Sequence, residues 1–278
     1  MILRRHLSIT ARLLLATLLA ALAGFPLYWM LATAITPSSQ LFNGAQPLIP
    51  DFTRIPNAFQ ALAGGTPFLR WMTNSGIVAG GTTIFSLLLA TLAAYALSRY
   101  RFRGKGLIGF GFFATQMLPE ALLVVPMYSL FMSLGLLNQL HGLIMVDTAI
   151  ATPVATWVLK AAIDTVPYEI EEAGLLDGCG PLRVLGRIVV PIIAPSLAAA
   201  GVICFFDGWG EYLFATTFIE DKSRWVASTG LASFIGEFET PLDLVFSAAL
   251  IFTIPAIIFF VIVQRRIVSG LAAGSVKG

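Results

Sequence analysis

The stretch that decides the fold class of this protein runs from Leu244 to Val263 and reads LVFSAALIFTIPAIIFFVIV. Its 20 residues include no charged side chain. An α-helix needs about 20 predominantly apolar residues to cross the hydrocarbon core of a bilayer. The stretch therefore predicts a transmembrane helix.

Five more apolar runs of similar length precede it in the chain. They extend from Ala11 to Ala34, from Ser75 to Leu97, from Leu107 to Met132, from Leu143 to Ala162 and from Ser196 to Ile219. The first run is longer than the core of a signal peptide and contains bulky aromatic residues, so we expect a retained helix. The sequence predicts an all-α membrane protein with six transmembrane helices in a single domain over residues 1–278.

Four prolines are expected to bend three of these spans. Pro119 and Pro126 interrupt the third span, Pro153 the fourth and Pro255 the sixth. Proline removes a backbone hydrogen-bond donor and is the commonest cause of a sharp bend in a helix. We therefore expect kinks or broken turns at these positions rather than additional loops.

The composition excludes several classes of protein. The chain is 57% hydrophobic and only 12% charged, whereas soluble proteins carry about 25% charged residues. A large soluble domain is thus excluded, and a net charge of +2 gives no support for a nucleic-acid partner. The two cysteines have no neighbours at metal-ligand spacing, and no phosphate-binding G-x-x-x-x-G-K-[ST] loop occurs. We expect no catalytic residue, metal site or cofactor in this chain, and any ATP must be held by another chain.

The loops differ strongly in their content of lysine and arginine. Thirteen of these residues lie in the amino terminus, in the second-to-third and fourth-to-fifth loops and in the carboxy-terminal tail, and four lie in the other loops. Positively charged loops remain on the cytoplasmic side of a membrane. We therefore expect a multi-pass protein of the bacterial plasma (inner) membrane with both termini in the cytoplasm and external loops near residues 35–74, 133–142 and 220–243.

One cytoplasmic segment, residues 164–191, is too polar to be a span. Pro167 suits the first turn of a helix, and the glutamates that follow favour the amino-terminal end of the helix dipole. Asp177-Gly178 favours a stop and a turn, and residues 182–190 then place aliphatic and arginine side chains on different faces. The pattern predicts a short helix, a sharp turn and a second short helix. Periodicity alone leaves a long solvated loop open as an alternative.

The same segment resembles the E-A-A-x-x-D-G…I-x-x-P loop of binding-protein-dependent ABC importer permeases. The residues that carry the match are Glu172, Ala173, Gly174, Asp177, Gly178, Ile188 and Pro191. Gly174 stands where a second alanine is usual, and Cys179 where an alanine often follows the glycine. Both replacements are small, so two helices can still approach closely, although a glycine lowers helix stability by about 1 kcal/mol relative to alanine.

Other segments extend the resemblance to carbohydrate-importer permeases of the maltose-transporter second-subunit type. The tail from Gly270 to Gly278 reads GLAAGSVKG and is similar to their G-L-x-x-G-A-V-K-G ending. Residues 25–30, FPLYWM, resemble the same group. Residues 209–213, WGEYL, resemble its W-N-x-F/Y-L segment with Gly210 in place of asparagine.

The resemblance implies a type I ABC importer permease fold and a division of labour among subunits. Such permeases pair with a second, homologous permease and rest on two ATPase subunits, which bind ATP and Mg²⁺. They receive solute from an extracytoplasmic binding protein. Segment 164–191 would be the coupling loop that docks into the ATPase, and the tail residues Gly270, Gly274, Lys277 and Gly278 would contact the ATPase pair. This chain would be a membrane permease subunit and not an enzyme.

Four carboxylates, Glu120, Asp147, Asp207 and Glu211, fall inside predicted spans. An ionised carboxylate is costly there unless it faces water or a partner, so we expect all four to line one outward-opening cavity. Asp207 and Glu211 lie one helical turn apart and would repel each other in a dry site, so the site is wet or one carboxyl is protonated. With Trp209 nearby, the group suits a sugar. Two alternative roles for these carboxylates remain open: they cap broken helices, or they pair with groups of the second permease.

The sequence does not identify a single solute. No lysine or arginine lies deep in a predicted span, which favours a neutral sugar such as a di- or oligosaccharide over a phosphorylated solute. Importers of polyols and glycerol phosphate share the loop and tail patterns. A proton-coupled secondary transporter would use the carboxylates as relays, but it predicts an inverted repeat and no polar docking loop. No arrangement typical of an intramembrane enzyme is visible.

Overall fold

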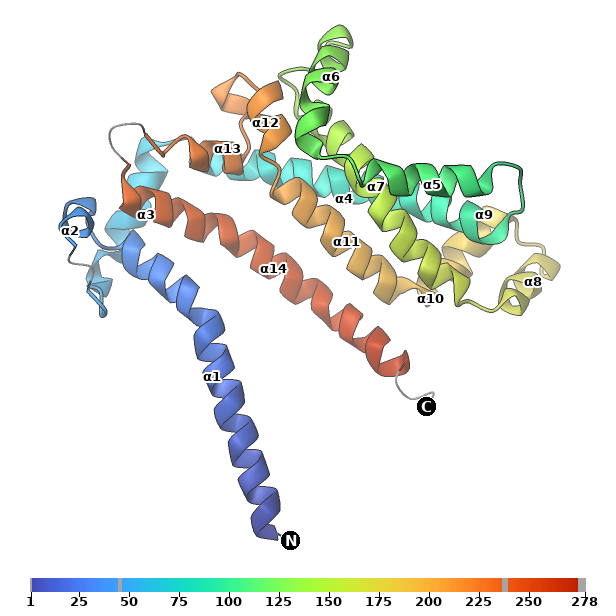
Figure 1. Cartoon of the computed structure of the whole chain (residues 1–278), viewed down its shortest axis with the longest axis horizontal. Coiled ribbons are helices and arrows are strands. Elements are labelled where there is room, and N and C mark those ends of the chain that lie inside the picture. Colours follow the sequence, from blue (N-terminus) through green and yellow to red (C-terminus); the bar gives the residue numbers. More distant parts are fainter. Residues whose placement is uncertain (1, 45–46, 237–239, 275–278) are drawn as a thin grey trace. The chain divides into compact units, whose positions relative to one another are not determined.

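The computed structural model describes residues 2–44, 47–236 and 240–274, and every regular element in these ranges is helical (Figure 1). The α-helices are α1 (Ile2–Ala34), α2 (Ser38–Phe42), α3 (Ile55–Gly65), α4 (Phe68–Arg99), α5 (Lys105–Thr115), α6 (Glu120–Ser133), α7 (Leu140–Asp164), α8 (Tyr168–Leu176), α9 (Pro181–Val184), α10 (Val190–Ile192), α11 (Ala194–Trp209), α12 (Leu213–Phe218), α13 (Ala227–Ala232) and α14 (Leu242–Gly274). Two 3₁₀ turns, η1 (Phe52–Arg54) and η3 (Lys222–Arg224), and one π-helical turn, η2 (Leu185–Val189), complete the secondary structure.

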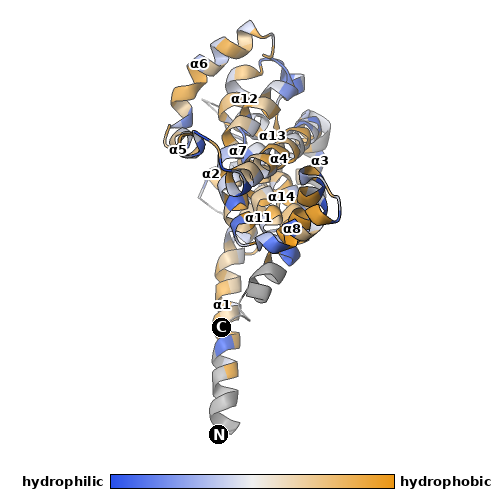
Figure 2. Ribbon diagram, turned by 90° about the vertical axis from the view of Figure 1, so that its right-hand side faces the viewer, coloured by the Kyte–Doolittle hydropathy of each residue, from blue (hydrophilic) through white to orange (hydrophobic). Residues whose placement is uncertain are grey.

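The helices confirm the predicted spans. Five stretches of the described chain are long and apolar enough to cross a membrane, namely the apolar part of α1, α4, α7, α11 with α12, and α14. The bent pair α5 and α6 supplies a sixth if it is counted as one span. Figure 2 shows the apolar colour along α6. The fold class is therefore an all-α membrane protein, as the sequence predicts.

The third span is broken rather than gently kinked. Helices α5 and α6 meet at an angle of 103°, and Pro119 precedes α6 in an extended conformation. The bend therefore lies at Pro119, where the sequence predicts a kink or a broken turn. By contrast, Pro126, Pro153 and Pro255 lie inside helices that continue past them.

The fifth span is also broken, which the sequence did not predict. Helix α11 ends at Trp209, and α12 begins at Leu213. The Glu211 carboxylate accepts hydrogen bonds from the backbone N–H groups of Phe214, at 2.6 Å, and Ala215, at 3.1 Å. A side-chain acceptor at this place satisfies the free amides of a new helix start. Asp207 and Glu211 therefore do not share the face of one continuous helix.

The chain forms two compact units, which are described separately. One unit comprises residues 1–69 and 231–254, and within it the Ser38 hydroxyl donates a hydrogen bond of 2.6 Å to Asp243. The other comprises residues 70–230 and 255–278. In the second unit α7 packs along α11, and Leu159, Ile163 and Val189 are fully buried in the same core (Figure 1). All candidate sites below lie in this second unit.

Candidate functional sites

Segment 164–191 has the helix–turn–helix form that its sequence predicts. Helix α8 starts after Pro167, which takes an extended conformation, and ends before Asp177. Gly178 has a φ of +81°, a backbone conformation that L side chains rarely adopt. The chain then re-enters a helix at Pro181, in α9 and the π-helical turn η2. We call residues 164–191 the coupling module.

The inner face of the coupling module is packed against the ends of α4 and α7. Val184 and Val189 are fully buried in the core that also contains Ala94 and Ile163. A Cβ added at Gly174 would lie 2.5 Å from Ile188 Cδ1. The glycine at position 174 therefore allows α8 to approach η2 more closely than an alanine would, which gives a physical reason for this departure from the usual motif.

A buried ion pair joins the module to α4. The Arg99 guanidinium lies 2.5 Å from a carboxylate oxygen of Glu171, and their side chains are only 7% and 4% exposed. The Tyr95 hydroxyl donates a hydrogen bond of 2.9 Å to the other Glu171 oxygen, and Arg99 also donates to the carbonyl of Val166 at 2.8 Å. The Tyr168 ring lies under the guanidinium, 4.8 Å from ring centroid to Cζ. Both carboxylate oxygens of Glu171 and all three guanidinium nitrogens of Arg99 thus have partners inside the protein.

Sequence reasoning missed this ion pair. It treated Arg99 as one of several positive charges in a loop, and Glu171 as one of three glutamates that favour a helix start. Residues 99 and 171 are far apart in the chain, and no local pattern links them. Only the packing of α8 against the end of α4 shows that Glu171, and not Glu169 or Glu172, points inward.

The outer face of the coupling module exposes several large apolar side chains among its charged ones. Leu176 is 89% exposed and Leu182 is 73% exposed, and they flank the Gly178 turn. Leu175 and Ile170 are exposed as well. Large apolar side chains gathered on one exposed surface mark a site of protein–protein or membrane interaction.

The predicted coupling residues divide between the two faces. Glu172, Ala173, Asp177, Gly178 and Pro191 are exposed, Ile188 is half-buried, and Gly174 is buried. At the other end of the chain, α14 extends to Gly274 and includes Gly270. The predicted tail contacts at Lys277 and Gly278 lie outside the described residues.

The four intramembrane carboxylates line one cavity. Its volume is about 240 Å³, and its lining includes Glu120, Asp147, Asp207 and Glu211. Glu120 is the first residue of α6, and Glu211 precedes α12, so two of the carboxylates lie at the breaks of the third and fifth spans. Irregular backbone at membrane depth is tolerated where it is buried in protein or lines a water-filled cavity.

The carboxylates differ in their surroundings. Asp147 is 3% exposed, and its carboxyl group lies within hydrogen-bonding distance of the Glu211 carboxyl. Asp207 and Glu120 are exposed, and Glu211 is half-buried. Trp209 does not line the cavity: it is 5% exposed and stacks on Phe205, with the ring centroids 5.7 Å apart. Tyr212 is the aromatic residue in the lining.

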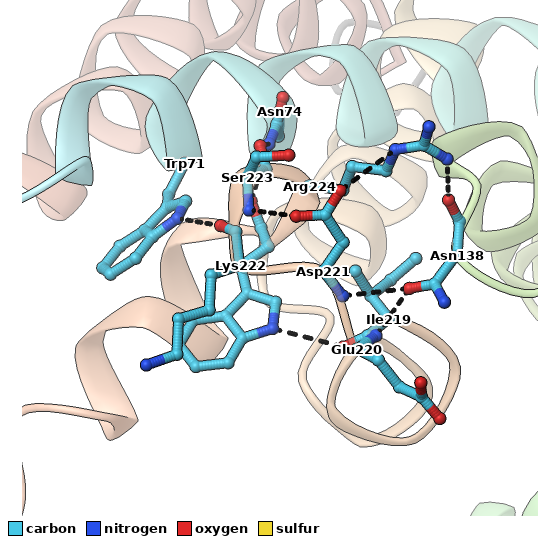
Figure 3. Close-up of polar contacts among 10 residues, drawn as sticks. Trp71, Asn74, Asn138, Ile219, Glu220, Asp221, Lys222, Ser223 and Arg224 are labelled. Carbon is cyan, nitrogen blue, oxygen red and sulfur yellow. Dashed lines mark hydrogen bonds and ion pairs between the residues drawn. The ribbon is translucent and has the colours of Figure 1, made fainter.

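A third feature is the rigid loop that joins α12 to α13 (Figure 3). The Asn138 side chain accepts hydrogen bonds from the amides of Glu220 and Asp221, at 2.7 and 3.0 Å. From α4, Trp71 donates to the carbonyl of Lys222 at 2.7 Å, and Asn74 donates to the carbonyls of residues 223 and 225. Asn138 itself has a φ of +59°, which is uncommon for a residue other than glycine. The surrounding helices therefore fix the conformation of this loop.

Comparisons with known proteins agree with these features. A sequence profile described as "binding-protein-dependent transport system inner membrane component" matches residues 86–272. The trehalose transport system permease protein SugB of Mycobacterium tuberculosis is 32% identical over 95% of this chain and 96% of its own length. The trehalose/maltose transport system permease protein MalG of Thermococcus litoralis is 31% identical over 95% of both chains.

A solved structure shows the same fold. It is that of a bacterial ABC transporter involved in the import of the acidic polysaccharide alginate. One of its chains has a TM-score of 0.77 and 20% sequence identity, with 94% of this chain and 96% of that chain covered. The helical fold and the coupling module thus define a type I permease of an ABC importer. The chain belongs to the family of binding-protein-dependent transport system inner membrane components.

Proposed function

We propose that this chain is the transmembrane permease subunit of an ATP-driven, binding-protein-dependent importer of a sugar, such as a di- or oligosaccharide. The observation that carries the proposal is the coupling module. Its inner face is locked to α4 by the Arg99–Glu171 pair, and its outer face exposes Leu176 and Leu182. A rigid module with an exposed apolar surface can pass the movement of a partner subunit to the spans.

The proposed assembly divides the work among several chains. Two ATPase subunits bind ATP and Mg²⁺ and contact the coupling module, with residues Glu172, Asp177 and Gly178 at the contact. The tail after Gly274 reaches the same ATPase pair. A second, homologous permease completes the pathway, a solute-binding protein delivers the solute, and membrane lipid surrounds the spans. This chain itself supplies no catalytic residue and holds no cofactor or metal.

The solute class rests on the relatives and on the carboxylate cavity. The relatives named above carry trehalose or maltose in their names. Carboxylates accept hydrogen bonds from sugar hydroxyls, and Tyr212 offers a ring at the same cavity. A glycerol phosphate or another anionic solute is disfavoured, because the described lining has four carboxylates and no basic side chain.

The proposed orientation places both termini and the coupling module in the cytoplasm. We expect a cysteine at position 176, in the coupling module, to react with a membrane-impermeant maleimide only after the cells are opened. A cysteine at position 48, whose leucine is 75% exposed, should react in intact cells. Cys179 is partly exposed, so both variants need a Cys179→Ser background. Labelling of position 176 from outside would contradict the orientation.

The importer function is tested by reconstituting the complete complex in proteoliposomes. We expect uptake of trehalose or maltose that requires both ATP and the binding protein. Uptake that proceeds without ATP and follows a pH gradient would instead indicate a proton-coupled transporter.

Asp207→Asn separates a role in the solute path from a role in assembly. The change keeps shape and removes charge, so we expect normal co-purification with the second permease. A hydrogen bond to a charged group contributes about 1.5–3 kcal/mol, so affinity at the site should fall roughly ten- to hundredfold. Loss of co-purification would assign Asp207 to the interface between the permeases.

A further inference from the structure

A long apolar groove lies between α5 and α7, which pack against each other at a place that the proposed function does not use (Figure 1). The volume of the groove is about 860 Å³. The large side chains of its lining are all aromatic or aliphatic: Phe110, Phe113, Val154, Trp157 and Val158. Phe110 is 64% exposed and Phe113 is 56% exposed. Apolar surface inside a membrane is covered by lipid or by another helix, so the shape and charge of the groove decide its occupant.

Glycines on α5 make room for this groove. Gly109 is buried, and a Cβ added to it would lie 3.5 Å from the ring of Trp157, so the indole rests against the α5 backbone. Gly106 also lines the groove, and a Cβ added there would have no heavy atom of the described chain within 4 Å. A larger side chain at position 106 would therefore project into the groove without a clash.

Positive charge lies at one end of the groove. Lys105 and Lys160 are in the lining, and the described lining contains no acidic side chain. Lys160 is paired with Asp164 at 2.6 Å. Lys105 is half-buried and donates to a backbone carbonyl at 3.3 Å, but it takes part in none of the ion pairs among the described residues. The loop before it adds the exposed Arg101 and Arg103. This end of the groove therefore suits an anionic group.

The length of the groove matches one leaflet of a bilayer. Lys105 begins α5 and Gln116 follows its last residue, and the distance along the helix is about 17 Å at 1.5 Å per residue. Half of a hydrocarbon core about 30 Å thick is about 15 Å. At the inner end the Gln116 amide donates a hydrogen bond of 3.1 Å to the carbonyl of Ile150, and α6 departs from the direction of α5 by 103°. A transmembrane helix of a partner would need a groove about twice as long.

We propose that this groove binds an anionic phospholipid of the cytoplasmic leaflet. The acyl chains lie against Phe110, Phe113 and Trp157, and the phosphate lies at Lys105. Basic pockets between transmembrane helices on the cytoplasmic side bind anionic headgroups. A zwitterionic lipid brings its own positive charge to the same place, so it binds less tightly. The site rests on the orientation proposed above, but it does not depend on the solute.

The test places a photoreactive amino acid in the groove. In the complete permease–ATPase complex, p-benzoylphenylalanine replaces Phe113, which is also aromatic; Phe110 is the alternative position if that variant does not assemble. The complex is placed in nanodiscs of equimolar dioleoyl phosphatidylglycerol, which is anionic, and dioleoyl phosphatidylcholine, which is zwitterionic. After illumination, the mass of the permease identifies the attached lipid. The matched control carries the same amino acid at Ile108, which is 47% exposed on the same helix but outside the groove lining.

We expect the ratio of phosphatidylglycerol adduct to phosphatidylcholine adduct to be about fivefold higher at position 113 than at position 108. One lysine near a membrane surface favours an anionic lipid by about this factor. Lys105→Gln should lower the ratio at position 113 to nearly the control value. Arg12→Gln, which removes an exposed positive charge from α1, should leave it unchanged. Gly106→Leu should lower the yield of both adducts at position 113 several-fold, because the leucine fills the groove.

Three results would overturn the inference. Equal ratios at positions 113 and 108 would show that the groove does not select an anionic lipid. A preference that survives Lys105→Gln would show that the phosphate does not lie at this lysine. A covalent link from position 113 to another subunit, seen on a denaturing gel, would show that a protein helix fills the groove. Because no solute is used, the lipid site and the importer function stand or fall on separate measurements.

Discussion

Replacing Glu171 by alanine is expected to uncouple ATP hydrolysis from transport and to lower the stability of the permease. The substitution leaves the Arg99 guanidinium, whose side chain is 7% exposed, without its carboxylate. Breaking a buried ion pair by removing one partner typically costs about 3–5 kcal/mol. It also removes the acceptor of the Tyr95 hydroxyl, so both polar contacts that Glu171 makes with α4 are lost. The measurements are the thermal midpoint of the assembled complex and solute-stimulated hydrolysis.

The matched control is Glu169→Ala, which removes an exposed carboxylate from the first turn of the same helix. We expect it to behave like the unmodified protein, because a surface charge contributes at most about 1 kcal/mol. The double variant Arg99→Met with Glu171→Leu should recover much of the lost stability, since apolar pairs often replace buried ion pairs at little cost. An unchanged thermal midpoint and normal stimulation in Glu171→Ala would show that the ion pair does not hold the module.

Gly178→Leu is expected to abolish most transport while the spans stay inserted. Gly178 has a φ of +81° and is exposed at the tip of the coupling module. A left-handed conformation costs other residues about 1–2 kcal/mol, which shifts a local equilibrium by about five- to thirtyfold. The leucine would also protrude from the surface that we assign to the ATPase contact. Transport and co-purification of the ATPase measure the effect.

Two companion variants separate the causes of that effect. Gly180 has a φ of −76° and open space around its Cα, so Gly180→Leu adds the same side chain nearby without backbone strain. Gly178→Asn keeps a residue that tolerates the left-handed region and should be milder than leucine. If Gly178→Leu transports as well as Gly180→Leu, the turn at residue 178 does not serve coupling.

The sequence alone allowed a correct prediction of the fold class, because the length and apolarity of a span are local properties of the chain. It also predicted the break at Pro119 and the helix–turn–helix of residues 164–191, since proline and glycine restrict or permit the backbone at their own positions. The family followed from short motifs in the same loop and in the tail. Each of these signals is contained within a few tens of residues.

The tertiary structure decided everything that depends on distant residues. It showed that Glu171 pairs with Arg99, that the fifth span breaks where Glu211 caps α12, and that Trp209 is buried away from the cavity. It also showed that the Asp147 carboxyl lies beside that of Glu211, a pairing of residues far apart in the chain that no sequence pattern indicates. The reason is physical: charge pairing and burial are set by which helices pack together, and that packing joins residues that are far apart along the chain.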